Sequence, residues 1–223
     1  MTLDELARKL LPNYIYQKVY ALRHLQKLSM RKGSYLVETG YINSIKRMEP
    51  VNKDGEPIPW MNYSFIDFLE PRLKRNMKVF EYGSGYSTLY LSNKVKSITS
   101  IEYDKDWFEK VAQDLKVKDN CRIEFYPAPD KYVKAIKDVD EGPYDLIIVD
   151  GRDREECVKY VIPFLSEGGV VILDDSWKAK FDEVFEYFQK NGFKEISFTG
   201  LKAGGMIIEK TTVFYRDNNV LGI

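Results

Sequence analysis

The sequence has very little histidine and cysteine, the residues that mark many metal and redox sites. Histidine occurs once, as His24, and the two cysteines, Cys121 and Cys157, lie in unrelated contexts without CxxC or metal-ligand spacing. A disulfide framework and a cysteine-based metal centre are therefore excluded. We expect both cysteines to be small buried residues in a reducing compartment. We expect His24, which lies away from every motif, to face solvent or to form a local hydrogen bond.

An excess of charge of one sign is also lacking. Lys and Arg number 34, as do Asp and Glu, so the formal net charge is zero and nucleic acid is not indicated as a partner. Residues 1–48 hold nine Lys and Arg against three Asp and Glu, scattered in a way that favours a solvated helix face over an acidic partner. No apolar run approaches a membrane span, and the N-terminus lacks an apolar signal core. We therefore expect a cytoplasmic protein without a membrane span.

The first quarter of the chain differs from the rest. Apolar residues at helical spacing over 2–30 predict two helices separated by a break at Pro12. Residues 40–60, rich in Pro, Gly, Asn and Asp, predict an ordered loop, and a helix is expected around 63–75. The pattern indicates an N-terminal helical arm and loop over 1–60 and one α/β domain over 61–223.

The second part alternates between strand-like and helical segments. Apolar runs that predict strands occur at 78–82, 97–101, 121–126, 144–149 and 169–173, with amphipathic segments between them. This alternation is typical of βαβ units in a parallel, doubly wound sheet. The segments 192–198 and 205–216 have no helix between them, so they predict a hairpin that places an antiparallel strand at the sheet edge.

A glycine turn, VFEYGSGYST, follows the first predicted strand. Gly83 and Gly85 would let a ligand approach the backbone, but Thr88 stands where a dinucleotide fingerprint has its third glycine. Glu81 would repel a pyrophosphate and attract an ammonium group. Glu102, nineteen residues after Gly83, ends the next strand and could accept hydrogen bonds from a ribose diol.

The third strand ends in FYPAPD, where residues 126–130 could cover an adenine and hydrogen-bond its amino group. A ligand with a ribose, an adenine and a cationic amino-acid end is implied. S-adenosylmethionine has all three parts.

The segments FEYGSGYST, SIEYD, YDLIIVDG and GGVVILDD, in this order, resemble the motifs of the class I S-adenosylmethionine-dependent methyltransferases. The resemblance spans roughly residues 77–215 and implies a Rossmann-like, seven-stranded sheet, mostly parallel, whose last strand is antiparallel. It also implies S-adenosylmethionine as the cofactor. The cofactor-binding residues expected on this basis are Glu81, Gly83, Ser84, Gly85, Ser87, Thr88, Glu102, Tyr103, Ala128, Asp130 and Asp150.

Three carboxylates follow two neighbouring predicted strands. Asp150 ends the fourth strand, and Asp174 and Asp175 end the fifth, so their side chains should converge beside the methyl donor. One interpretation is that all three bind Mg²⁺, which prefers oxygen ligands. The other is that Asp174 or Asp175 caps the following helix.

The carboxylate spacing is similar to that of metal-dependent O-methyltransferases of the catechol, caffeoyl-CoA and macrocin types. One departure concerns the lysine of the catechol-type pattern, because Asp153 stands in its place. The resemblance therefore leaves Asp150, Asp153 and water as alternative general bases.

The function expected from these residues is S-adenosylmethionine-dependent O-methylation of a small molecule or glycan. Whether Mg²⁺ assists the reaction is left open by the sequence. An NAD(P)-dependent oxidoreductase is the alternative enzyme, against which Glu81 and the missing third glycine count. A non-catalytic S-adenosylmethionine-binding protein is a third interpretation. The N-terminal helix and the terminal hairpin are candidate surfaces for a homodimer.

Overall fold

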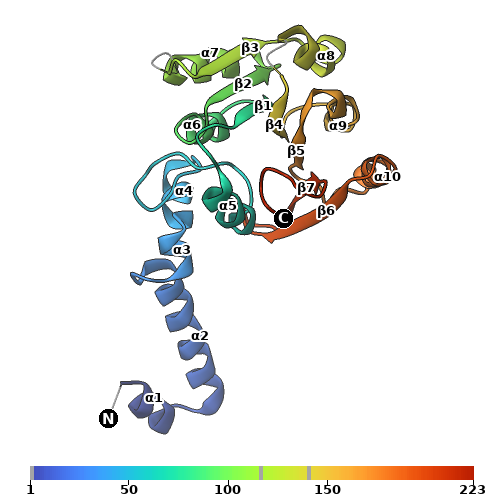
Figure 1. Cartoon of the computed structure of the whole chain (residues 1–223). Coiled ribbons are helices and arrows are strands. Elements are labelled where there is room, and N and C mark those ends of the chain that lie inside the picture. The colour runs from blue at the N-terminus through green and yellow to red at the C-terminus, as the bar shows by residue number, and fades with distance from the viewer. Residues whose placement is uncertain (1–2, 116–117, 140–141) are drawn as a thin grey trace.

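The computed structural model describes residues 3–115, 118–139 and 142–223, and it contains a seven-stranded sheet flanked by helices (Figure 1). The strands are β1 Lys78–Tyr82, β2 Ser97–Glu102, β3 Cys121–Phe125, β4 Tyr144–Val149, β5 Leu165–Leu173, β6 Lys194–Gly200 and β7 Glu209–Tyr215. The helices are α1 Leu3–Leu10, α2 Asn13–Met30, α3 Tyr35–Glu38, α4 Tyr41–Arg47, α5 Tyr63–Leu69, α6 Tyr86–Ser92, α7 Lys105–Leu115, α8 Asp130–Val139, α9 Arg154–Tyr160 and α10 Asp182–Lys190. Short 3-10 helices occur at Glu70–Arg72, Ile162–Phe164 and Ala179–Phe181.

The strand order is β3-β2-β1-β4-β5-β7-β6, and β1 to β5 run parallel. β7 pairs antiparallel with both β5 and β6. This confirms the predicted Rossmann-like sheet with an antiparallel last strand. The hairpin differs from the expectation in one respect. The antiparallel strand β7 lies inside the sheet, between β5 and β6, and β6 forms the edge. The reason is visible in burial, because β7 is mostly buried and β6 is mostly exposed.

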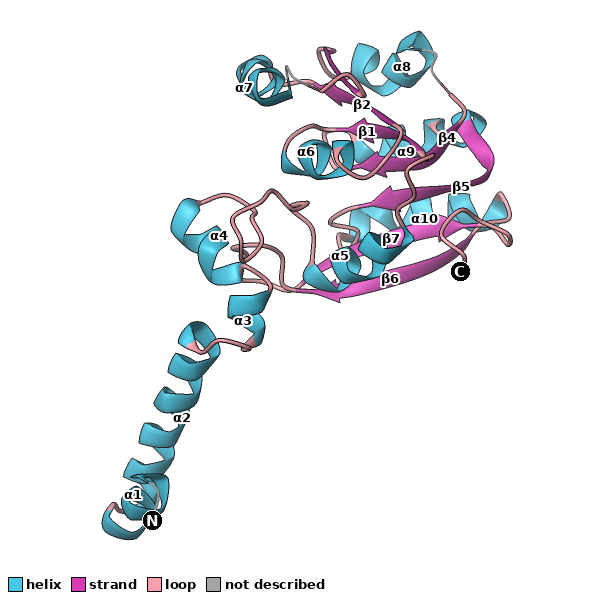
Figure 2. Ribbon diagram, turned by 60° about the vertical axis from the view of Figure 1, so that its left-hand side comes forward, coloured by secondary structure: helices cyan, strands magenta, loops and turns pink. Residues whose placement is uncertain are grey.

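Two apolar cores, one on each face, hold the sheet between its helices (Figure 2). One core packs α8, α9 and α10 against side chains such as Phe80 and Phe214. The other packs α5 and α6 against side chains such as Val79 and Ile172. Neighbouring residues of a strand point to opposite faces, so each strand contributes to both cores. With both faces covered by helices, ligands bind outside the carboxyl ends of the parallel strands.

The N-terminal helices α1 and α2 extend away from the sheet (Figures 1 and 2), and α2 has no buried residue. The predicted break at Pro12 is confirmed, since α1 ends at Leu10 and α2 begins at Asn13. His24 forms the expected local hydrogen bond, in which its Nδ1 donates to the Tyr20 carbonyl oxygen at 2.9 Å. Within the part of the chain that the structure describes, no helix has both the length and the apolarity to cross a bilayer.

The segment predicted as a loop over 40–60 contains the helix α4, which the composition did not indicate. Gly40 and Met48, both with positive φ, bound this helix. A side chain at position 40 would overlap the backbone of Val51 and Asn52, so tertiary contact fixes the segment. The Tyr41 hydroxyl donates to the Gly205 carbonyl oxygen at 2.7 Å and fastens α4 to the β6–β7 connection.

Candidate active site

The strand register brings the predicted motifs to one edge of the sheet. Tyr82 at the end of β1 pairs with Ile101 of β2 and with Val149 of β4, and Val149 pairs with Leu173 of β5. The residues that follow these partners are Gly83, Glu102, Asp150 and Asp174. They therefore lie in a row where ligands bind in open α/β sheets.

The glycine turn requires glycine at two positions. Gly83 has φ 99°, and a Cβ there would lie 2.9 Å from the Asp150 carbonyl oxygen. Gly85 has φ 148°, and a Cβ there would lie 3.3 Å from the Trp107 ring. The indole Nε1 of Trp107 donates to the Ser84 carbonyl oxygen at 2.8 Å. The turn is thus held close to β4 on one side and to α7 on the other.

Glu81 lies beneath the turn and is fully buried. Its carboxylate accepts hydrogen bonds from the hydroxyls of Ser87, Thr88 (2.5 Å) and Ser100 (2.7 Å). Burial raises the pKa of Glu81, and these three hydroxyl donors counteract part of that rise. Glu81 therefore fixes the start of α6 from within; the predicted contact with a ligand ammonium stays a prediction.

Glu102 is held at the other side of the turn. Its Oε1 accepts from the backbone N–H groups of Tyr103 (2.8 Å) and Asp104 (2.9 Å), and its Oε2 accepts from the Ser84 hydroxyl (2.7 Å). The guanidinium of Arg152 lies over the Tyr103 ring, 5.6 Å from its centroid. The carboxylate is thus fixed before any ligand binds.

A cavity of about 390 Å³ opens beside this turn. It is lined by residues from six separate segments, namely Trp60, Ser84, Gly85, Tyr86, Ser87, Trp107, Asp150, Arg154, Asp175 and Lys202. Of the predicted residues, the structure therefore brings Ser84, Gly85, Ser87, Asp150 and Asp175 to one cavity.

Arg154 joins the carboxylates on the floor of this cavity. Its Nη2 lies 2.8 Å from Asp150 Oδ1, and its Nη1 lies 3.5 Å from Asp175 Oδ2. Nη1 also donates to the Asp174 carbonyl oxygen at 2.7 Å, and Nε donates to the Gly151 carbonyl oxygen at 2.9 Å. The guanidinium is mostly buried, so these contacts fix it in one position.

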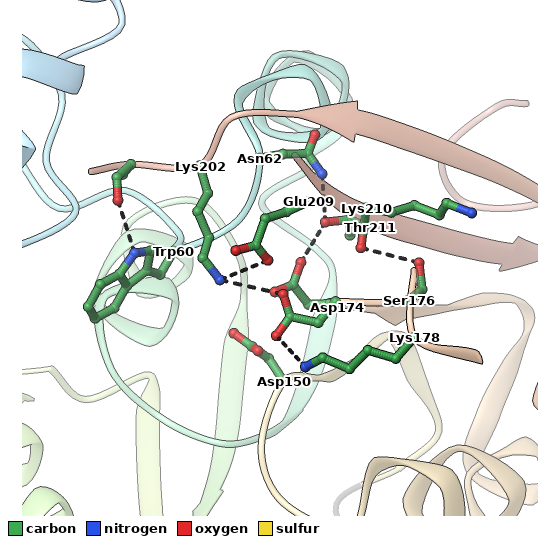
Figure 3. Close-up of polar contacts among 12 residues, drawn as sticks. Trp60, Asn62, Asp150, Asp174, Ser176, Lys178, Lys202, Glu209, Lys210 and Thr211 are labelled. Carbon is green, nitrogen blue, oxygen red and sulfur yellow. Dashed lines mark hydrogen bonds and ion pairs between the residues drawn. The ribbon is translucent and has the colours of Figure 1, made fainter. Parts of the chain in front are cut away.

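Lys202, on the connection between β6 and β7, also points into this carboxylate cluster, next to Glu209 (Figure 3). Its Nζ lies 3.4 Å from Asp175 Oδ1 and 3.1 Å from Glu209 Oε2. Lys178 Nζ lies 3.3 Å from Asp175 Oδ2. Asp174 is buried behind them and accepts a 2.5 Å hydrogen bond from the Thr211 hydroxyl, to which Asn62 Nδ2 donates at 2.9 Å.

The surroundings give the three aspartates different acidities. Burial, opposed by Arg154 and reinforced by Asp175, raises the pKa of Asp150 to about 6. Burial and the neighbouring carboxylates raise the pKa of Asp174 well above its usual range. Burial alone would raise the pKa of Asp175 too, but a hydrogen bond from Glu209 and the charges of Arg154 and Lys202 lower it.

These contacts bear directly on the predicted Mg²⁺ site at Asp150, Asp174 and Asp175. Two of the carboxylates are already paired with Arg154, Lys178 and Lys202, and Asp174 turns toward Thr211. Among residues 3–115, 118–139 and 142–223, no group of three His, Cys, Asp or Glu side chains could hold a metal ion. The donor set therefore does not fit a divalent cation, because basic side chains already balance its charge.

The alternative interpretation, a helix cap, is not observed either. Asp175 has φ 53°, and the next α-helix, α10, begins only at Asp182.

The predicted general base Asp153 lies away from the active-site cavity. Together with Asp130, it lines a different cavity of about 340 Å³ between α8 and α9, which shares no lining residue with the first. Ala128 packs against the core on that side.

No sequence motif pointed to three residues that the structure places at the site. Trp107 and Lys202 line the cavity, and Glu209 pairs with Lys202. Trp107 follows the acidic strand end of β2 by five positions and has the spacing of any amphipathic helix residue. Lys202 and Glu209 flank the β6–β7 connection, which sequence patterns did not link to the first strand. Their role depends on the hairpin folding back over β5.

Residues 80–176 match a family model described as a methyltransferase domain. No match is found among curated proteins. Solved structures with the same fold include an rRNA methylase from Streptococcus thermophilus, which is 16% identical with a TM-score of 0.54, covering 68% of this chain and 93% of that one.

Two O-methyltransferases also share the fold. TomG from Streptomyces achromogenes, in complex with S-adenosylmethionine, is 18% identical with a TM-score of 0.54, covering 67% of this chain and 77% of that one. The Bacillus cereus enzyme, in complex with S-adenosylhomocysteine, is 11% identical with a TM-score of 0.55, covering 67% and 78%. Residues 80–176, which run from β1 to β5, thus match a methyltransferase domain, and the seven-stranded sheet has the fold of these methyltransferases.

Proposed function

We propose that the enzyme methylates a hydroxyl oxygen of a small-molecule acceptor, a class that includes glycans. The observation that carries this proposal is the position of Asp150. It lines the cavity immediately beside the glycine turn, and its pKa of about 6 suits a general base near neutral pH. The O-methyltransferases of the same fold are consistent with such an acceptor.

The cofactor end of the cavity is formed by the glycine turn and Glu102. The close approach of Gly83 to β4 and of Gly85 to Trp107 leaves backbone open where side chains would block a ligand. Glu102, already fixed by two backbone N–H groups, would accept hydrogen bonds from the ribose hydroxyls in place of the one from Ser84. When bound there, S-adenosylmethionine supplies an electrophilic methyl group on its sulfonium.

The acceptor end is formed by Asp150, Arg154 and Lys202. The carboxylate of Asp150 would take the proton of the acceptor hydroxyl as that oxygen attacks the methyl group. Arg154 holds Asp150 in place through the 2.8 Å contact. Burial alone would lower the pKa of Lys202, but the charge of Asp175 and the contact with Glu209 raise it above its usual range, so Lys202 is an ammonium that can hold the acceptor oxygen. Magnesium has no step in this proposal.

The test measures cofactor binding and methyl transfer separately. Calorimetric titration with S-adenosylmethionine should show binding, and titration with NADH should not. Transfer of tritiated methyl groups is then measured over a panel of phenols, aliphatic alcohols, sugars and amines between pH 5 and 8. We expect hydroxyl acceptors to be used, with a rate that falls about tenfold per pH unit below pH 6, where Asp150 becomes protonated.

Each result that contradicts the proposal points to a different function. Methyl transfer to the amines alone would overturn O-methylation but would still be consistent with a methyltransferase that acts on nitrogen. Binding of S-adenosylmethionine without transfer to any class would favour a binding protein. Binding of NADH in its place would favour the oxidoreductase alternative.

A further inference from the structure

A second cavity of about 350 Å³ adjoins the active site, and its lining is mostly apolar. It lies between α4 and the β6–β7 connection. Its side chains include Tyr41, Ile45, Met48, Trp60, Ala203 and Met206. We call it the annex.

The annex and the active-site cavity share a wall. Trp60 lines both cavities, and its Nε1 donates to the Ala203 carbonyl oxygen at 3.0 Å (Figure 3). Lys202 lines the active site, and the next residue, Ala203, lines the annex. A ligand that bends around the Trp60 ring would therefore occupy both cavities at once.

A second link lies across the mouth. Tyr86 belongs to the active-site cavity and Glu49 to the annex. Burial raises the pKa of Tyr86 to about 12, and a hydrogen bond with Glu49 and the charge of Glu49 add to this rise. The polar groups of the annex lining are few: Ser44, Glu49 and the hydroxyl of Tyr41.

The rim of the annex exposes large apolar side chains. Met48 is 86% exposed and Met206 is 90% exposed, and Ile45 is about half exposed. Clusters of exposed apolar side chains beside a cavity commonly mark a ligand surface. Methionine is unbranched and flexible, so it adapts to a chain without a fixed shape. The hydrogen bond from Tyr41 to Gly205 keeps the two sides of the annex together.

We propose that the annex binds an aliphatic arm of the methyl acceptor while the acceptor hydroxyl lies beside Asp150 and Lys202. The acceptor is then an amphiphile, with one polar, nucleophilic end and one aliphatic end. This inference rests on the proposed function, since it takes the first cavity as the site of methyl transfer. It narrows the acceptor class, because a purely hydrophilic sugar would leave the annex empty.

The experiment uses primary alcohols of increasing length, from 1-butanol to 1-octanol, as probes. Each is titrated calorimetrically into the full chain after saturation with S-adenosylhomocysteine. Burial of each added methylene should strengthen binding by about threefold to fourfold. Equal affinities along the series would overturn the proposal.

Matched variants locate the effect. Ile45→Asp and Met206→Asp place a charge in the annex at exposed positions and should abolish the dependence on chain length. Ile207→Asp is the control, because Ile207 is exposed and adjacent to Met206 but does not line the annex. Chain-length dependence that survives Ile45→Asp and Met206→Asp would overturn the proposal.

Two further outcomes are separable. Failure of S-adenosylhomocysteine to bind, with chain-length dependence intact, would contradict the proposed function and keep the annex as a ligand site. Sedimentation of the wild type and of Ile45→Asp tests a different occupant. A dimer that Ile45→Asp dissociates would show that a second copy covers the annex and would overturn the proposal.

Discussion

The cofactor side and the acceptor side of the cavity differ in how their residues are distributed along the chain. The cofactor side is local: the turn that contains Gly83 and Gly85 and the carboxylate of Glu102 all lie at the ends of adjacent strands. The acceptor side joins Trp60, before the first strand, to Lys202, after the sixth. One side is specified by short motifs and the other by tertiary packing.

The two sides also differ in how charge is balanced. Near the turn, Glu81 and Glu102 accept hydrogen bonds from hydroxyl and backbone N–H donors. On the acceptor side, Arg154 and Lys202 balance the carboxylates directly. Substitutions should therefore affect cofactor affinity on one side and turnover or stability on the other.

The largest effect is expected for Asp150→Asn. Removing a general base lowers rates by about 10²- to 10⁴-fold, so turnover should fall at least 100-fold, and the affinity for S-adenosylmethionine should change by no more than about threefold. Asp153→Asn is the control, because Asp153 lines the other cavity. Single-turnover kinetics and calorimetry measure the two quantities. An equal loss in Asp153→Asn would restore Asp153 as a candidate base.

This contrast explains what the sequence predicted. Strand-end motifs predicted the parallel sheet and the glycine turn, because register alone brings Gly83, Glu102 and Asp150 together. Carboxylate spacing suggested a metal, since no sequence pattern identifies Arg154 or Lys202 as the cations that balance these carboxylates. Arg154 begins α9, four residues after Asp150, and Lys202 reaches Asp175 only because β7 inserts beside β5.

The next effect concerns Arg154→Met. The variant leaves Asp150 and Asp175 without their buried guanidinium, and we expect a loss of about 3 kcal/mol in the free energy of unfolding at pH 7. Asp150 has a raised pKa in the folded protein, so its charged form is the costly one. Lowering the pH from 7 to 5 protonates it and should recover part of the difference from wild type.

Urea unfolding at both pH values measures this change. Arg152→Met is the matched control, since Arg152 is exposed and lies over the Tyr103 ring; its loss should stay within about 0.5 kcal/mol. A loss of equal size at pH 5 and pH 7 would contradict the assigned role of Asp150.

A smaller effect is expected on the cofactor side. Glu102→Gln keeps the shape of the side chain but removes its charge, and hydrogen bonds to charged groups are worth about 1.5–3 kcal/mol. Binding of S-adenosylmethionine should weaken about 10- to 100-fold, as measured by calorimetry. Glu109→Gln, at an exposed position of α7, should bind like the wild type. Unchanged affinity in Glu102→Gln would remove Glu102 from the cofactor site.

The smallest effect separates two adjacent aspartates that share one strand end. Burial and the neighbouring carboxylates raise the pKa of Asp174, which penalises its charged form, and the Thr211 hydroxyl contacts it, so Asp174→Asn should cost less than about 1 kcal/mol at pH 7. Asp175 has a lowered pKa and three cationic neighbours, so Asp175→Asn should cost about 2 kcal/mol. The stability that Asp175 contributes is present above pH 4 and is lost as the pH falls toward its folded pKa, so the two variants should converge in acid. Equal costs at pH 7 would mean that both carboxylates are charged, which is the state that a bound cation would require.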